Sequence, residues 1–475
     1  MTHPRFHPAL SILLILAVLL AACQPLTTTT PGVATPRVTP RPLATLIPTA
    51  TPPAPTQTPS FPADVQRLQG LKLVVWHPWL DELQAALQKE ADEFNRTNTW
   101  GIQVVLKGLG GPAALENALL NTSDGDLPGL VIAAPESLAA WQQGGGSLFA
   151  LSTLAEDPEW GLTADEKADF LPGLWPTFGP EEVYFSLPVL RNARFIIYNR
   201  SWADELGFSD PPATPDELSE QVCTAMRANL LADYTLRGTG GWLLDNDAYT
   251  LAGWLDGFGA SFAPSGPDAP YSFSSPAGEQ TFGYLYQLIS DKCTVSVTTA
   301  LPEPYAIFAG RRALAYAASL ADLPMQAKVN KKLGSQDRWD VLPFPALEGS
   351  GVIPLYGLDF GLIGGSSEEE LAGWLFIRWL LLARNQVSLA LAGGMLPVTS
   401  SGLLDLRSRT LPTLQYRELL ALADHFQPLP APAAWRTARR ALEDAAWQLY
   451  QPYTKAEDIP GILQQLDEMI KALNK

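Results

Sequence analysis

Short apolar runs alternate with amphipathic segments along the chain, and this alternation restricts the possible folds more than any other feature. Residues 71–76 form a continuous, β-rich apolar run, and in residues 81–98 the apolar side chains recur at helical spacing. The same patterns predict strands at 102–106, 130–134, 195–198, 313–316 and 358–363, and helices at 113–120, 136–143, 369–382, 435–450 and 459–473. Continuous apolar strands between amphipathic helices are typical of an α/β fold in which helices cover both faces of mostly parallel sheets.

The amino terminus has the pattern of an export signal. Arg5 precedes residues 9–22, which are apolar except for Ser11. A run of this length is too short to cross a hydrocarbon core as a helix, and it matches the apolar region of a signal peptide. The run ends in Leu-Ala-Ala followed by Cys23, which resembles the lipobox of bacterial lipoproteins. We therefore expect a signal peptide over residues 1–22 and lipid on Cys23. The alternative is an ordinary secretory signal that ends near a cysteine.

Residues 23–63 are expected to hold the lipidated cysteine and a tether. Of the thirty-nine residues from 24 to 62, eleven are Pro, eleven are Thr and none is Asp or Glu. Such a segment cannot bury enough apolar surface to offset its ordering entropy, so we expect an extended, solvated linker. In a polyproline conformation of about 3.1 Å per residue, the linker would reach roughly 120 Å from a membrane.

The remaining body, residues 64–475, is long enough for two lobes with separate cores. It holds 29 basic and 49 acidic residues, a formal charge of −20. Nucleic acids and anionic membrane surfaces require a basic face, so this charge disfavours both as partners. The simpler interpretation, that the acidity aids solubility, accounts for most of it.

The body contains two cysteines, Cys223 and Cys293. An exported chain meets an oxidising compartment, where an even pair is more naturally a disulfide than two free thiols. Neither lies in a Cys-x-x-Cys motif, and only His77 and His425 remain after signal removal, so a zinc site would need better spacing. We expect the disulfide, and no metal or cofactor.

No catalytic signature stands out. The chain lacks the Gly-x-Ser-x-Gly, His-Glu-x-x-His and Gly-x-x-x-x-Gly-Lys motifs. Asp245-Asn246-Asp247 begins like a calcium loop, but Thr250 stands where such a loop needs glycine. A glycosidase-like pair of carboxylates stays open, because the chain has 49 acids. We expect a protein that is not an enzyme.

Several short segments of the body carry a further signal. They are Lys72-Leu-Val-Val-Trp76, Glu93-Phe-Asn-Arg-Thr-Asn98, Ser186-Leu-Pro188, Phe195-Ile-Ile-Tyr-Asn199, Leu206-Gly207, Pro211-Pro-Ala-Thr-Pro-Asp-Glu-Leu218, Phe308-Ala-Gly-Arg-Arg-Ala313 and Gly393-Gly-Met-Leu-Pro-Val398. In this order they resemble the family 1 extracellular solute-binding proteins, the maltodextrin- and sugar-binding receptors of ABC importers. The chain departs from the family pattern at Gly129, where Asp is usual, and at Arg312, where a small residue or Lys is usual.

The resemblance implies a two-lobed, type II periplasmic-binding-protein-like fold, whose lobes close over a ligand about hinge crossovers. It assigns residues 64–186 and 358–396 to lobe 1, residues 187–357 and 397–475 to lobe 2, and crossings near 184–190, 356–360 and 396–400. It also implies a monomeric, lipid-anchored, extracytoplasmic receptor that captures a carbohydrate, or a similar neutral polar solute, and delivers it to the permease subunits of an ABC transporter. A receptor that signals instead of transporting, and a tethered carbohydrate-active enzyme, are the alternatives.

Sugars present flat C–H faces and many hydroxyls, so their sites need aromatic platforms and planar polar groups. Strand ends and the implied crossings predict a ligand site made of Trp79, Glu136, Arg191, Asn192, Trp242, Asp247, Tyr249, Tyr316, Tyr356, Trp435 and Arg439. Trp435 is the first choice, because it resembles the family's stacking Trp at the start of a C-terminal helix. Arg439 lies one turn further along the same helix face.

Several of these candidates have structural alternatives. Trp79 could anchor the helix at 81–98, and Glu136 could act only as a first-turn acid that favours the helix dipole. Arg191 could pair with a nearby acid. Trp242 and Trp435 could be core residues.

Overall fold

The computed structural model describes residues 60–176, 183–236, 238–264, 270–296 and 303–473. These residues belong to one compact unit, Thr58–Lys475. Cys23, the predicted signal peptide and nearly all of the predicted linker lie outside the described residues. Within the described ranges no single helix is long and apolar enough to cross a membrane, and α13 (Ser367–Leu381) with α14 (Ala383–Gly393) pass that test only as a pair bent by 75°.

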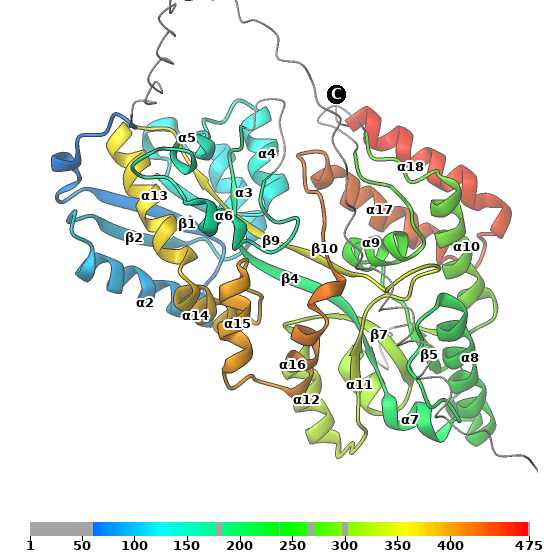
Figure 1. The fold of residues 1–475 in the computed structure, drawn as a ribbon. Coiled ribbons are helices and arrows are strands. Elements are labelled where there is room, and N and C mark those ends of the chain that lie inside the picture. Colours follow the sequence, from blue (N-terminus) through cyan, green and yellow to red (C-terminus); the bar gives the residue numbers. More distant parts are fainter. Residues whose placement is uncertain (1–59, 177–182, 237, 265–269, 297–302, 474–475) are drawn as a thin grey trace, which may run out of the picture. The chain divides into compact units, whose positions relative to one another are not determined.

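The strands form one continuous mixed sheet (Figure 1). They are β1 (Lys72–His77), β2 (Gln103–Gly108), β3 (Leu130–Ala133), β4 (Leu187–Tyr198), β5 (Gly240–Leu243), β6 (Thr294–Val295), β7 (Ala313–Ser319), β8 (Asp340–Leu342), β9 (Ile353–Leu362) and β10 (Phe426–Pro428). Their order is β2-β1-β3-β9-β4-β7-β5-β6, with β10 beside β9 and β8 beside β4. We call the half that holds β1, β2 and β3 lobe 1, and the half that holds β5, β6 and β7 lobe 2.

Parallel pairing dominates the outer part of each lobe. β1 is parallel to β2 and β3, and β5 is parallel to β6 and β7. Antiparallel pairing is confined to the middle of the sheet, where β4 pairs with β7, β8 and β9, and β9 pairs with β3. The α/β fold with largely parallel sheets is therefore confirmed.

Helices cover both faces of the sheet (Figure 1). Besides α13 and α14 they are α2 (Glu82–Thr97), α3 (Pro112–Asn121), α4 (Pro135–Gln143), α5 (Leu151–Ala155), α6 (Ala164–Ala168), α7 (Arg200–Glu205), α8 (Pro215–Ala232), α9 (Ala248–Gly257), α10 (Pro276–Ser290), α11 (Pro304–Ala309), α12 (Asp322–Leu333), α15 (Ser400–Ser408), α16 (Leu414–Ala421), α17 (Trp435–Leu449) and α18 (Ile459–Leu473). Short 3₁₀ turns occupy Val65–Leu68, Asp124–Asp126, Tyr234–Leu236, Ala423–His425 and Ala456–Asp458.

Local sequence chemistry sets where the helices begin. At α8 the Thr214 side chain accepts a hydrogen bond from the Glu217 N–H while the Glu217 carboxylate accepts one from the Thr214 N–H, and Pro215 takes the first helical position. Ser366 and Glu369 form the same reciprocal cap at α13. Such caps satisfy backbone donors that have no partner within the helix.

Two long strands, β4 and β9, connect the lobes. β9 pairs with β3 of lobe 1 and with β4. The first part of β4, from Leu187 to Ala193, pairs with β9, and the last part, from Arg194 to Tyr198, pairs with β7. The expected strand at 195–198 is therefore only the end of a longer strand. The sequence pattern did not predict the first part of β4, because its apolar residues are interrupted by Arg191, Asn192 and Arg194.

The apolar core only partly follows the division into lobes. One buried cluster packs α9, α10, α17 and α18 onto lobe 2, with Trp254, Phe282 and Leu442 among its members. Another runs from β1 in lobe 1 along β4 to α16, and it includes both Leu73 and Tyr416. Lobe 2 thus has a cluster of its own, while the other cluster is continuous between the lobes.

A disulfide joins Cys223 of α8 to Cys293, the residue before β6. The two Cα atoms lie 4.6 Å apart across a sequence separation of 70 residues. Cross-linking a loop of this length stabilises a fold by about 4 kcal/mol in the chain-entropy model. The bond ties the long helix of lobe 2 to the strand at the edge of its sheet.

His77 ends β1 and is fully buried at 0% exposure. Within the described part of the chain neither ring nitrogen has a hydrogen-bond partner. Burial lowers the pKa of His77 to about 4, although the nearby Asp81 carboxylate opposes the shift. The imidazole is therefore neutral in the fold at physiological pH.

His77 should make the fold sensitive to acid. Because the unfolded chain binds a proton near pH 6.5 and the folded chain only near pH 4, the stability present above pH 6.5 is lost progressively as the pH falls toward 4, by up to about 3 kcal/mol. Denaturant unfolding across this range should show a shallower decline for His77→Leu than for the wild type. Identical slopes for His77→Leu and the wild type would contradict this role.

Candidate ligand-binding site

Six of the predicted site residues come together where α4 of lobe 1 meets α9 and α17 of lobe 2. They are Glu136, Asp247, Tyr249, Tyr356, Trp435 and Arg439, and we call them the interlobe cluster. Glu136 comes from α4, Tyr249 from α9 and Arg439 from α17. Side chains from both lobes therefore meet at one place.

Aromatic rings form one side of the cluster. Tyr249 stacks on Tyr356 of β9 with ring centroids 3.7 Å apart and planes inclined by 9°. The indole of Trp435 lies 6.3 Å from the Tyr249 ring and 5.3 Å from that of Tyr271. Burial raises the pKa of Tyr249 and of Tyr356, so both hydroxyls are neutral donors.

A buried carboxyl and a guanidinium form the other side. Glu136 lies in the first turn of α4 and is only 4% exposed. Burial raises the pKa of its carboxyl, while the Arg439 guanidinium opposes the shift. The Arg439 guanidinium lies 5.9 Å from the centre of the Tyr249 ring. Within the described chain the buried Nε of Arg439 has no hydrogen-bond partner, so this donor is unsatisfied in this arrangement of the lobes.

Hydrogen bonds from Asp247 and Arg194 hold the first turn of α9 in place. Asp247 caps the helix, and its Oδ1 accepts hydrogen bonds from the N–H groups of Tyr249 (3.0 Å) and Thr250 (3.2 Å). Arg194 of β4 donates from Nε to the Thr250 hydroxyl at 2.8 Å and lies 3.5 Å from the Asp245 carboxylate. Asp247 therefore positions Tyr249 instead of offering both carboxylate oxygens to a ligand.

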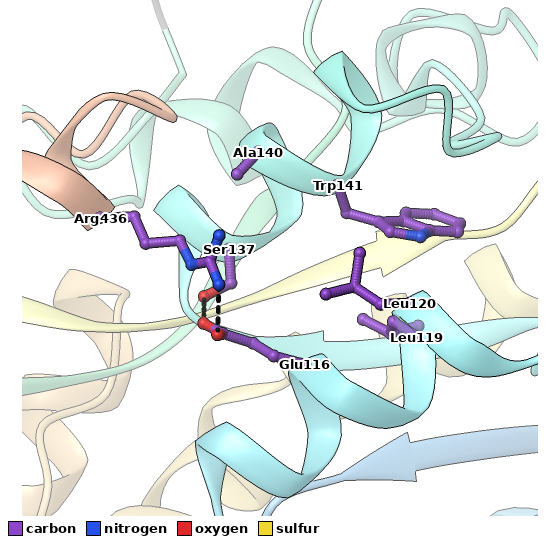
Figure 2. A pocket seen from close by; sticks show the side chains of 7 residues that line it. All are labelled: Glu116, Leu119, Leu120, Ser137, Ala140, Trp141 and Arg436. Atoms are coloured by element: carbon purple, nitrogen blue, oxygen red, sulfur yellow. Dashed lines mark hydrogen bonds and ion pairs between the residues drawn. The ribbon is translucent and has the colours of Figure 1, made fainter. Parts of the chain in front are cut away.

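A second contact between the lobes lies beside the cluster. Arg436 of α17 pairs with Glu116 of α3 at 3.3 Å, and the Ser137 hydroxyl donates to the same carboxylate. Figure 2 shows these groups at a cavity of ≈ 40 Å³, with Trp141 on another side. Sequence reasoning missed these residues and Arg194. Of these residues, Arg436 could have been proposed from the sequence, because it directly follows Trp435, which was predicted to lie in the site.

The family model for bacterial extracellular solute-binding proteins matches residues 77–387, which is more than half of the chain. The chain belongs to this family. No curated protein sequence matches the solute-binding protein significantly.

Solved structures share its fold at low sequence identity. The cyclic α-maltosyl-1,6-maltose binding protein of Arthrobacter globiformis is 18% identical, with a TM-score of 0.68 over 85% of this chain and 99% of that chain. The sugar-binding protein MalE of Xanthomonas citri is 15% identical, with a TM-score of 0.69 over 85% and 98%. UgpB of Mycobacterium tuberculosis, solved with glycerophosphocholine, is 16% identical, with a TM-score of 0.64 over 85% and 99%. These likenesses confirm the two-lobed fold.

Trp435 is not the open platform that we expected from the sequence. Its indole is only 1% exposed and belongs to the lobe 2 core, packed against Tyr271 and Phe262. The alternative interpretation, a core tryptophan, describes its environment in the solute-binding protein. Its indole packs near the Tyr249 ring and so helps to position that side chain.

The other predicted residues have structural partners outside the cluster. Trp242 packs edge-on against Trp254 in the lobe 2 core, at 5.4 Å. The Tyr316 hydroxyl donates to Gln326 at 2.7 Å. These two side chains are buried within lobe 2, so their assignment to the ligand site is not supported by their placement.

Three more candidates lie on β4 or just after β1. Arg191 forms a buried ion pair with Asp359 at 2.8 Å, as its structural alternative anticipated. The Asn192 side-chain oxygen accepts from the Leu320 N–H at 3.2 Å, which joins β4 to the end of β7. Trp79 is half-buried and packs 5.5 Å from the His77 ring. Asn192 lies opposite Tyr356 in the pairing of β4 with β9, but within the described residues no side-chain contact joins any of these three to the interlobe cluster.

Replacing Trp435 should therefore lower the stability of the fold more than it lowers the affinity for a ligand. Trp435→Ala leaves a cavity in the lobe 2 core and should lower the free energy of unfolding by about 3–5 kcal/mol, measured by denaturant titration. Trp447→Ala is the control, because Trp447 lies on the same helix and is 57% exposed. Equal, small losses for the two variants would show that the Trp435 ring is not a core element.

Proposed function

We propose that this solute-binding protein captures a carbohydrate, or a similar neutral polar solute, between its lobes and delivers it to the permease subunits of an ABC transporter. The observation that carries the proposal is the interlobe cluster, in which a buried carboxyl, stacked tyrosines and a guanidinium whose Nε has no partner among the described residues meet from both lobes. Planar polar groups and aromatic faces are the groups that sugar hydroxyls and C–H faces require.

Capture follows from where these groups come from. Opening the lobes separates α4 from α9 and α17, which exposes Glu136, Tyr249 and Arg439 to solvent. A solute that contacts all three gains its full set of interactions only when the lobes close again, so binding and closure are coupled. Glu136 and Arg439 bind hydroxyls, and Tyr249 with Tyr356 offers an aromatic surface.

The names of similar proteins support the ligand class without defining it. Two of the proteins above are described as binding a cyclic maltose derivative and sugar, and a third was solved with glycerophosphocholine. A thermal-shift screen of the full chain should therefore contain maltose, maltotriose, a cyclic maltodextrin and glycerophosphocholine. A ligand at one hundred times its Kd stabilises by about 2.7 kcal/mol. Product formation in the same samples would indicate an enzyme instead of a receptor.

Glu136→Gln should weaken binding of the solute identified by that screen. Loss of a carboxyl oxygen that hydrogen-bonds a ligand in a buried site costs about 1–3 kcal/mol, which is roughly a five- to hundred-fold rise in Kd by calorimetry. Glu82→Gln is a matched control, because Glu82 is also a first-turn acid of a lobe 1 helix but is exposed. Equal affinities for Glu136→Gln and the wild type would remove the interlobe cluster from the site.

We also propose that lipid on Cys23 anchors the protein outside the cytoplasm and that residues 24–62 act as its tether. The support is the signal-like run that ends at Cys23 and the Pro- and Thr-rich composition that follows. Cys23→Ser should abolish metabolic labelling with a fatty acid and either release the protein from membranes or leave it unprocessed. Unchanged labelling of the variant would refute the anchor.

A further inference from the structure

Helix α17 presents two guanidinium groups to lobe 1. Arg436 and Arg439 stand three residues apart, so their side chains lie on the same face of the helix. Arg439 acts on the Glu136 carboxyl in the interlobe cluster, and Arg436 reaches Glu116 of α3, with 3.3 Å between a terminal nitrogen and Oε2. Because α17 packs into the core of lobe 2 and α3 into that of lobe 1, this ion pair bridges the lobes.

Glu116 is held in place by its own lobe. The Ser137 hydroxyl of α4 donates to Oε1 of Glu116, while Arg436 pairs with Oε2 (Figure 2). Each carboxylate oxygen therefore has a partner from the protein. The bond from Ser137 lies within lobe 1, so separation of the lobes does not break it, and Glu116 stays in position to receive Arg436 again.

The space beside this ion pair is too small for a solute. The cavity there measures ≈ 40 Å³, and its apolar lining is Leu119, Leu120, Ala140 and Trp141. This volume holds a few water molecules and is far below the ≈ 300 Å³ at which small-molecule sites begin. The side chains of Arg436 and Glu116 are 38% and 21% exposed, so water also reaches the pair from outside. The pair therefore joins the closed lobes without room for a ligand between its partners.

We propose that the ion pair of Arg436 with Glu116 is a latch, which favours closed lobes even without ligand and so sets the affinity for every solute that the lobes enclose. Opening carries Arg436 away with α17 and exchanges the ion pair for hydration of both charges. The apparent affinity of a ligand that binds the closed form is proportional to the closed fraction, so loss of the latch weakens all such ligands by one factor. The effect on affinity rests on the proposed function, whereas the effect on the ligand-free protein does not.

The ligand-free protein gives the first test. Spin labels at the exposed positions Asn121 of α3 and Asp444 of α17 report the closed and open populations by pulsed electron resonance. A partly exposed ion pair shifts an equilibrium about two- to fivefold, so Glu116→Gln should lower the ratio of closed to open protein by that factor. Asp405→Asn is the matched control and should leave the ratio unchanged, because Asp405 is also partly exposed but pairs at 2.8 Å with Arg409 of its own helix, α15.

Arg436→Gln separates the latch from a general change of charge. Each single variant should lower the ratio by the same factor, and the double variant with Glu116→Gln should lower it no further, because all three lack the same interaction. Glu116 also acts on the Glu136 carboxyl. Removal of the anion and removal of the cation change the environment of that carboxyl in opposite senses, so equal effects of the two single variants do not arise from Glu136.

Affinity gives the second test. For every solute that stabilises the protein in the thermal-shift screen, both single variants should raise the Kd by one common factor of up to about five. A residue that contacts the ligand would instead give a factor that differs from one solute to the next. Thermal unfolding verifies that each variant is folded.

Three results would overturn the proposal: an unchanged ligand-free distribution in Glu116→Gln, additive effects of the two substitutions in the double variant, or changes in Kd that differ between solutes. The measurement on the ligand-free protein needs no ligand. It therefore decides on the latch even if no solute of the screen binds, so failure of the latch and failure of the proposed function are distinguishable.

Discussion

The structure depends on one buried ion pair at the point where the lobes join. The Arg191 guanidinium binds the Asp359 carboxylate at 2.8 Å and donates to the Leu358 carbonyl at 2.7 Å, while Ser186 donates to the other oxygen of Asp359 at 2.8 Å. The backbone of Arg191 also exchanges hydrogen bonds with Leu396. All three implied crossings therefore meet at Arg191. Removing one partner of such a pair leaves a buried charge uncompensated, which costs about 3–5 kcal/mol.

A glycine beside the ion pair lets the strands lie close together at the crossing. A Cβ at Gly357 would lie 2.2 Å from the Leu190 carbonyl oxygen, so only glycine allows this approach of β9 to β4. Asp359 also contributes to the electrostatic environment of Glu136. The junction between the lobes and the interlobe cluster are thus connected electrostatically, because the Asp359 charge acts on the Glu136 carboxyl.

The sequence predicted the elements with regular periodicity and the family to which they belong. The apolar strand at 71–76 and the helix at 459–473 were found within a residue or two, because their patterns have one clear period. It could not distinguish a tryptophan that stacks on a ligand from one buried in the core, because the sequence does not show how exposed an indole such as that of Trp435 is. Asp247 was expected to face the ligand, but its position before α9 makes it a cap. Contacts such as Glu116 with Arg436 join residues 320 positions apart, and no local pattern encodes them.

In the proposed function, solute binding and closure of the lobes are one event. Spin labels at the exposed positions Asn121 of α3 and Asp444 of α17 report the separation of the lobes. Pulsed electron resonance of the ligand-free protein should give a broad distribution that includes distances longer than in the structure. The ligand that gives the largest thermal shift should narrow it to the short distance. A distribution unchanged by a ligand that stabilises the protein would contradict the account.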